Sequence, residues 1–367
     1  MRHQFVRRVV SLAAALSVSL SLAGSAAGQA TTPYVAPQHT SGWPGLGTGD
    51  DQAAAEASLE LGPELERDRS PVWMLADQRR LDRALAALQP EHKGVVDAYV
   101  VAIGLDSDPI FGREAREAGK VLSRRYNAVG HTIVLAGTDG SGPTQLPNGT
   151  PRALALTLAR IAELMDKSED VLVLYTAGHG APVGLAYHDG DEGFGIISPA
   201  RMARMFDELG IKNRLLILSA CYSGVFVPSM ASDTTALFTA ASADRTSFGC
   251  AADRDWTFFG DAMINHALRQ PVSLAKAGED ARALIAKWEG MDPDITPSQP
   301  QVSIGSSVAK WLGPLEARMP RTATAMVGRP AISIFSDAAS PSDAGPARIA
   351  TPSGDKGSQG ARKRPRR

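Results

Sequence analysis

Short apolar runs alternate with amphipathic segments through the middle of this chain. Four runs have the length and composition of buried strands and stop in small-residue turns, at residues 95–105, 131–137, 171–180 and 215–224. The segments between them carry apolar residues at helical spacing. Because strands that alternate with helices pair in parallel through crossovers, the pattern predicts an α/β fold: a mostly parallel sheet flanked by helices on both faces.

Local signals place the remaining elements. Thr150 and Pro151 are an N-cap and first residue for a helix with Leu154, Leu158 and Ile161 on its buried stripe. An acidic turn, residues 188–192, predicts a hairpin over residues 183–197, and we expect this turn to be solvated. Further helices are expected at 111–126, 199–209, 256–268 and 274–288, and further strands at 235–241 and 301–304.

The two ends of the chain differ from its middle. Basic residues, an apolar run and then small residues predict a secretory signal peptide over residues 1–30. Residues 31–92 are expected to form a linker and an N-terminal helical segment. The main domain is expected at 93–319. Residues 320–367, rich in Pro, Ser, Ala and Gly with a basic end, are expected to be a disordered basic tail.

Composition narrows the class of protein. The 367 residues are 44% hydrophobic and carry a net charge of −1, which predicts a sizeable core and no nucleic-acid partner. No apolar stretch after the N-terminus could span a bilayer, so we expect no stable membrane insertion after signal cleavage. The protein is expected to be exported, to the periplasm or the extracellular space. In these oxidising compartments its two cysteines, Cys221 and Cys250, could instead form a structural disulfide, which is the alternative to a reactive Cys221.

Two strand ends carry reactive side chains. His179 lies between two glycines after the run that begins at Val171, and Cys221 follows the run that begins at Leu215. Reactive groups collect beyond the carboxyl ends of parallel strands, so we expect the imidazole and the thiol to meet. An imidazole can activate a thiol as a nucleophile and later protonate a leaving amine. The backbone N–H groups of Gly180 and Cys221 are the expected oxyanion donors.

These segments resemble the caspase-like (clan CD) cysteine peptidases, and within them the legumain or peptidase C13 family. The likeness is carried by His179-Gly180 and by Ala220-Cys221-Tyr222-Ser223-Gly224. Residues 239–250, with Ser242, resemble the family's substrate-pocket strand. Gly260-Asp261 resembles the Gly-Asp that places an acid in the S1 pocket. The resemblance covers about residues 95–305 and implies a caspase-like three-layer sandwich.

The chain also departs from the family pattern. The family's pocket glutamate, two residues before the nucleophile, is Ser219 here, and its pocket arginine corresponds to Arg113 or, one residue earlier, Gly112. The Asn that orients the catalytic histidine has no clear match, although residues 106–108 (Asp-Ser-Asp) lie in the corresponding loop. The resemblance leaves Asp261, Ser219, Ser242 and Arg113 as expected substrate-binding residues.

The sequence therefore predicts an exported, bacterial-type cysteine endopeptidase that acts on peptides or proteins through a Cys221–His179 dyad and an acyl-thioester. The P1 residue is expected to be Asn or basic, and neither a cofactor nor a metal is expected. Two alternatives stay open. One is a transpeptidase or protein ligase of the same fold. The other is a non-catalytic surface-binding module with Cys221 and Cys250 bridged.

Overall fold

The computed structural model describes residues 38–137 and 145–337. The predicted signal peptide, at residues 1–30, and the basic end of the predicted tail lie outside the described residues. Within the described ranges, no helix combines the length and the apolar character needed to cross a membrane.

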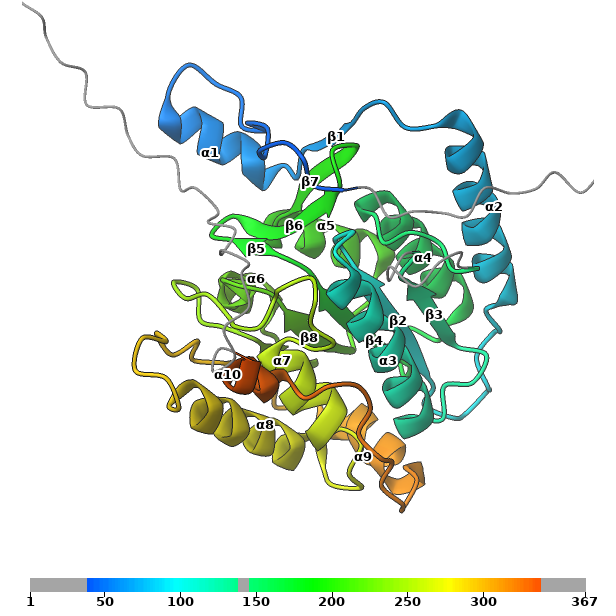
Figure 1. Cartoon of the computed structure of the whole chain (residues 1–367). Coiled ribbons are helices and arrows are strands. Elements are labelled where there is room, and N and C mark those ends of the chain that lie inside the picture. Colours follow the sequence, from blue (N-terminus) through cyan, green and yellow to red (C-terminus); the bar gives the residue numbers. More distant parts are fainter. Residues whose placement is uncertain (1–37, 138–144, 338–367) are drawn as a thin grey trace, which may run out of the picture. The chain divides into compact units, whose positions relative to one another are not determined.

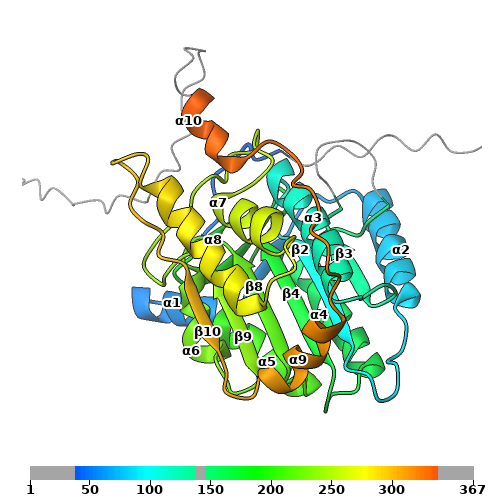
Figure 2. The same ribbon diagram turned by 90° about the horizontal axis from the view of Figure 1, so that it is seen from below.

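A six-stranded sheet forms the centre of the domain, in the order β10-β9-β8-β4-β2-β3. Figure 1 labels its strands β8, β4, β2 and β3, and Figure 2 also labels β9 and β10. All neighbouring strands are parallel except β10, which pairs antiparallel with β9. The three strands β2, β4 and β8 are buried along their whole length, as the continuous apolar runs predict. The bounds are β2 Ala98–Gly104, β3 Thr132–Leu135, β4 Val171–Ala177, β8 Arg214–Ser219, β9 Thr235–Thr239 and β10 Gln301–Ile304.

Helices cover both faces of this sheet, which confirms the predicted α/β sandwich (Figure 2). Alternate residues of β2 enter different cores, with Val100 and Ala102 facing one helical layer and Tyr99 and Val101 facing the other. The first core is built with α3 Pro109–Arg125, α7 Phe258–Gly260, η2 Asp261–Ala267, α8 Leu274–Glu289 and α9 Ala309–Arg318. The second is built with α2 Pro71–Ala87, α4 Pro151–Leu164, α5 Pro199–Leu209 and α6 Val227–Met230.

A small antiparallel sheet lies beyond the carboxyl end of β4. It contains the predicted hairpin, as β6 Gly184–Asp189 and β7 Gly193–Ile197, with β5 Gly180–Ala181 on one side. The N-terminal segment, expected to be helical, supplies the fourth strand, β1 Glu64–Glu66, between two helices. The other elements are α1 Gln52–Glu60, η1 Ser223–Phe226, η3 Ala331–Ser333 and α10 Ile334–Asp337.

Helix boundaries follow the capping signals in the sequence. The side chain of Thr150 accepts a hydrogen bond from the Ala153 N–H, and that of Ser198 accepts one from the Arg201 N–H. The predicted helix at 256–268 differs from expectation. Its first turn is α-helical, but from Asp261 it continues as a π-helix. The spacing of apolar residues in the sequence does not distinguish this rare helix from an α-helix.

Residues 320–337, which the sequence assigns to a disordered tail, lie against the domain instead. The N–H of Val327 donates to Oδ1 of Asn265 at 2.9 Å, and Nδ2 of Asn265 donates back to the Val327 carbonyl at 3.1 Å. The N–H of Ala331 donates to the buried carboxylate of Asp261 at 2.7 Å. Backbone hydrogen bonds hold the polar part of the segment, and Ala331, Ile332, Ile334 and Phe335 pack against the core.

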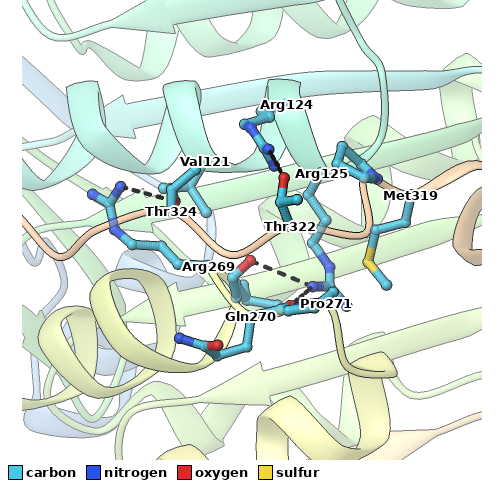
Figure 3. A pocket seen from close by; sticks show the side chains of 11 residues that line it. Val121, Arg124, Arg125, Arg269, Gln270, Pro271, Met319, Thr322 and Thr324 are labelled. Atoms are coloured by element: carbon cyan, nitrogen blue, oxygen red, sulfur yellow. Dashed lines mark hydrogen bonds between the residues drawn. The ribbon is translucent and has the colours of Figure 1, made fainter.

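Arginines from α3 and the end of η2 hold the same segment, around a small pocket shown in Figure 3. Arg124 donates to the Thr322 hydroxyl at 3.0 Å, and Arg269 donates to the Thr324 hydroxyl at 3.4 Å. The third arginine, Arg125, donates to backbone carbonyls, including that of Gln270 at 3.0 Å. The guanidinium groups that line this pocket therefore donate hydrogen bonds to other residues of the chain.

We predict that Asn265→Ala loosens residues 320–337, because it leaves the N–H of Val327 without its acceptor and the Val327 carbonyl with only the Trp256 indole N–H as donor. Loss of these buried hydrogen bonds should lower the free energy of unfolding by about 1–3 kcal/mol. Trypsin should then cleave after Arg321 faster than in the parent protein. The control is Lys276→Ala, on the exposed face of α8, which should change neither quantity. Equal cleavage rates in parent and Asn265→Ala would contradict this attachment.

Candidate active site

Strand pairing aligns the two segments that carry His179 and Cys221. In the parallel ladder between β4 and β8, Ala177 is the register partner of Ser219. The strands β4 and β8 are labelled in Figure 1, and His179 and Cys221 each follow two residues after this pair of register partners. The ladder continues for one more hydrogen bond, from the Gly178 N–H to the Ser219 carbonyl at 3.2 Å.

Gly180 lies directly against the nucleophile's backbone. A Cβ atom built on Gly180 would lie 1.9 Å from the carbonyl oxygen of Cys221, well inside van der Waals contact. Only glycine permits this approach. The glycine after the histidine is therefore a packing requirement of the two turns, in addition to its expected role as an oxyanion donor.

The ring of His179 is held between a carboxylate and an aromatic edge. Its Nε2 lies 3.8 Å from Oδ2 of Asp106, a side chain with no exposed surface. The ring of Phe111 packs edge-on at a centroid distance of 5.0 Å. The carbonyl of His179 accepts from the Ala186 N–H at 3.0 Å, which ties the turn to β6. Of the acid-rich loop 106–108, Asp106 is thus the residue that faces the histidine.

The thiol of Cys221 is half-buried and faces the loop after β9. The N–H of Ser247 donates to its Sγ at 3.2 Å, and the Ser247 hydroxyl oxygen lies 3.7 Å away. The next residue, Tyr222, has φ 56° and ψ 11°, a left-handed conformation that is uncommon for a non-glycine residue. Its N–H donates to the Arg245 carbonyl at 2.8 Å. The chain therefore turns sharply at the nucleophile.

Both cysteines are free thiols in the structure. Burial, followed by the nearby Cys221, raises the pKa of Cys250 to about 11. Cys250 therefore lies close enough to sense Cys221 while remaining a protonated, unreactive thiol at neutral pH. The alternative with a bridged Cys221–Cys250 pair is not the arrangement found.

Two of the expected substrate-binding residues are buried away from solvent. Asp261 has no exposed surface, and its carboxylate accepts from Asn265 Nδ2 at 2.8 Å and from the Ala331 N–H. Ser219 is 2% exposed and donates to Glu114 at 2.7 Å. Their environments give them structural roles, and the expectation that they line an open pocket is corrected.

The other two are also engaged with the chain. Ser242 is buried and donates to Asp244 at 2.7 Å. Arg113 comes from α3 and donates to the carbonyls of Ala252, at 3.1 Å, and Arg254. It therefore holds the loop beside the thiol in place. A family arginine expected to bind substrate is here bonded to backbone oxygens of the chain.

A glutamate that the sequence reasoning missed lies beneath the nucleophile. Glu114, wholly buried on α3, accepts hydrogen bonds from the hydroxyls of Tyr175, Ser219 and Thr257 and from the Thr257 N–H. Burial raises its pKa, while these donors act in the opposite direction. One carboxyl thus joins α3, β4, the end of β8 and the start of α7. The sequence feature that could have revealed Glu114 is its position, since it is a charged residue on the apolar face of a predicted helix.

The acidic hairpin turn is also engaged, which corrects the expectation that it is solvated. Asp189 forms an ion pair with Arg69 at 2.7 Å. Asp191 accepts from the backbone N–H groups of Thr40, at 3.1 Å, and Ser41, at 2.9 Å. Residues before α1 therefore lie along the hairpin, and they bring His39 close to Asp106, a contact that the sequence did not predict.

We predict that Glu114→Gln becomes more stable relative to the parent as pH rises. In the unfolded chain a glutamate loses its proton near pH 4.3, whereas burial keeps Glu114 protonated to higher pH in the folded protein. The parent therefore loses stability between these two pKa values, and Gln, which does not titrate, does not. Urea unfolding from pH 4 to pH 8 measures this difference.

The matched control for that series is Glu279→Gln, on the exposed side of α8. Its stability difference from the parent should not change with pH. A constant difference between Glu114→Gln and the parent across the pH range would contradict a raised pKa for Glu114.

Two of the three comparisons with known proteins found a similarity. Among solved structures, caspase-1 from Spodoptera frugiperda is similar at 15% identity, with a TM-score of 0.41, over 59% of this chain and 92% of that one. The curated proteins contain no match to the chain. The model of the peptidase C13 family matches residues 154–294, less than half of the chain but including both His179 and Cys221. The stretch that carries these two residues is therefore similar to the peptidase C13 family.

Proposed function

We propose that the protein is an endopeptidase in which Cys221 and His179 form the catalytic dyad. The observation that most supports this proposal is the register of β4 with β8. In this register, His179 and Cys221 each follow the end of their strand at the same edge of the sheet. The free thiol with a backbone N–H donor at 3.2 Å is a second support. Members of the matched family act on proteins or peptides, which is the substrate class proposed here.

In the proposed reaction, Cys221 Sγ forms a bond to the scissile carbonyl carbon as its proton passes to His179. The C–N bond then breaks, and His179 gives that proton to the leaving amine. Water hydrolyses the resulting thioester. The N–H groups of Gly180 and Cys221 are proposed to stabilise the oxyanion. Asp106, 3.8 Å from Nε2 of His179, is proposed to orient the ring with its Nε2–H toward the carboxylate, so that the unprotonated Nδ1 accepts the thiol proton.

We predict that Cys221→Ala abolishes cleavage of a P1-scanning fluorogenic peptide library under reducing conditions, because no other group can form the thioester. Cys250→Ala should retain turnover, since Cys250 is a protonated thiol. Turnover by Cys221→Ala would contradict the proposal. Product analysis with an added amine nucleophile separates hydrolysis from peptide ligation.

We further propose that P1 is basic. Asp108 lies beside the site with 27% of its side chain exposed, and its charge contributes to the raised pKa of Cys250. The nearest arginine of the family pattern, Arg113, is bonded to the carbonyls of Ala252 and Arg254. A partly exposed carboxylate that interacts electrostatically with His179 and Cys250 favours an arginine or lysine side chain of substrate.

We predict that Asp108→Asn lowers kcat/KM for P1-Arg peptides by about tenfold, the effect of losing about 1.4 kcal/mol of charge-assisted binding. The same variant should leave cleavage of P1-Asn peptides, if any, unchanged. Asp280→Asn, on α8, is the charge-matched control and should have no effect on either. A parent enzyme that prefers P1-Asn would refute the basic P1 and leave the dyad intact.

A further inference from the structure

Three side chains of metal-binding type converge next to the catalytic histidine. His39 Nδ1 lies 2.8 Å from His188 Nε2, and His39 Nε2 lies 3.1 Å from Asp106 Oδ1. His188 Nδ1 lies 3.8 Å from Asp106 Oδ2. In each of the three pairs, the nearest ligand atoms of the two residues lie within 4 Å of each other. One ligand atom can also be chosen from each residue so that all three atoms lie within 4.8 Å of one another.

The backbone holds two of these ligands rigidly. The His188 N–H donates to the Leu105 carbonyl at 2.9 Å, and the Ser107 N–H donates to the His188 carbonyl at 3.0 Å. The backbone of Asp106 therefore lies opposite that of His188, because both residues next to Asp106 hydrogen-bond to the His188 backbone. The third, His39, precedes the residues whose N–H groups bind Asp191. The cluster is preorganised on the small sheet and completed by the N-terminal segment.

One oxygen in this cluster is left without a hydrogen bond. Oδ2 of Asp106 is buried and has no hydrogen-bond partner within the described part of the chain. Its nearest charged or titratable neighbours are His188 Nδ1 and His179 Nε2, each 3.8 Å away. A buried carboxylate oxygen without a partner is costly, and a cation is the ligand that satisfies it best. This orphan atom distinguishes the cluster from an ordinary hydrogen-bonded group.

The surroundings also favour a bound cation. The ion pairs of Asp106 in the described residues involve only histidines, with no lysine or arginine. A second carboxylate, Asp108, lies 3.6 Å from His39 Nε2. The rings of Trp43 and Phe194 pack on His188 at centroid distances of 5.2 and 5.1 Å, which limits water access.

We propose that His39, Asp106 and His188 form a binding site for a divalent transition metal of the Zn²⁺ class. Two imidazoles and a carboxylate match the ligand preference of Zn²⁺. The consequence rests on the proposed peptidase function: a metal bound to Asp106 competes with its contact to His179. Zn²⁺ therefore inhibits peptide cleavage, and it fixes the N-terminal segment against the active site.

The test is isothermal titration of Zn²⁺ into the full chain, free of any histidine tag, in a Cys221→Ala/Cys250→Ala background that removes thiol ligands. Binding is measured without any need for activity, so failure of the metal site and failure of the peptidase function are distinguishable. We expect a single equivalent of Zn²⁺ to bind. His39→Ala and His188→Ala should each lower the affinity for Zn²⁺ by at least about tenfold. Removing a residue that only supports a metal ligand already costs about tenfold to a hundredfold in metal affinity.

The matched control is His92→Ala. His92 belongs to another group of His and Asp side chains, with Asp97 and His131, but the Asp97 carboxylate there already accepts the His92 N–H at 2.6 Å. Zn²⁺ affinity should be unchanged in this variant, and circular dichroism should show all variants folded. Absence of binding in the parent, or full affinity in both His39→Ala and His188→Ala, would overturn the site.

Discussion

The parallel pairing of β4 with β8 is the constraint on which the active site depends. His179 and Cys221, far apart in sequence, each follow by two residues a pair of register partners on neighbouring parallel strands, and Gly180 lies against the backbone of Cys221. A slip of one residue would turn either side chain to the opposite face of the sheet. Both strands are buried along their whole length between the two helical layers, and most of their residues are apolar.

The surroundings of this pair show how a buried polar group supports a reactive one. Glu114 joins four elements under the nucleophile, and its bond to Ser219 ends only two residues before Cys221. Each of its acceptor atoms is satisfied, which a buried carboxyl requires. The close contact between Gly180 and the Cys221 carbonyl fixes the turns from the other side. The reactive groups are therefore placed by packing and hydrogen bonds that do not take part in the chemistry.

Much of this arrangement follows from local signals in the sequence. Apolar runs and caps such as Thr150 predict the strands and helices, and strand order then places His179 beside Cys221. What the sequence could not give are contacts between distant segments. The approach of His39 to Asp106, across 67 residues, has no periodicity to announce it. Family likeness likewise mislocated Asp261, because a motif records the residue type and not the partners that bury it.

The most direct test of the central claim is covalent labelling with a peptidyl acyloxymethyl ketone, which alkylates only a thiol activated within a substrate site. Mass spectrometry of the intact and digested protein locates the label. The account predicts a single modification at Cys221, none at Cys250, and no modification in His179→Ala. Labelling of Cys221 at an unchanged rate in His179→Ala would contradict the claim that the paired strands create a functional dyad.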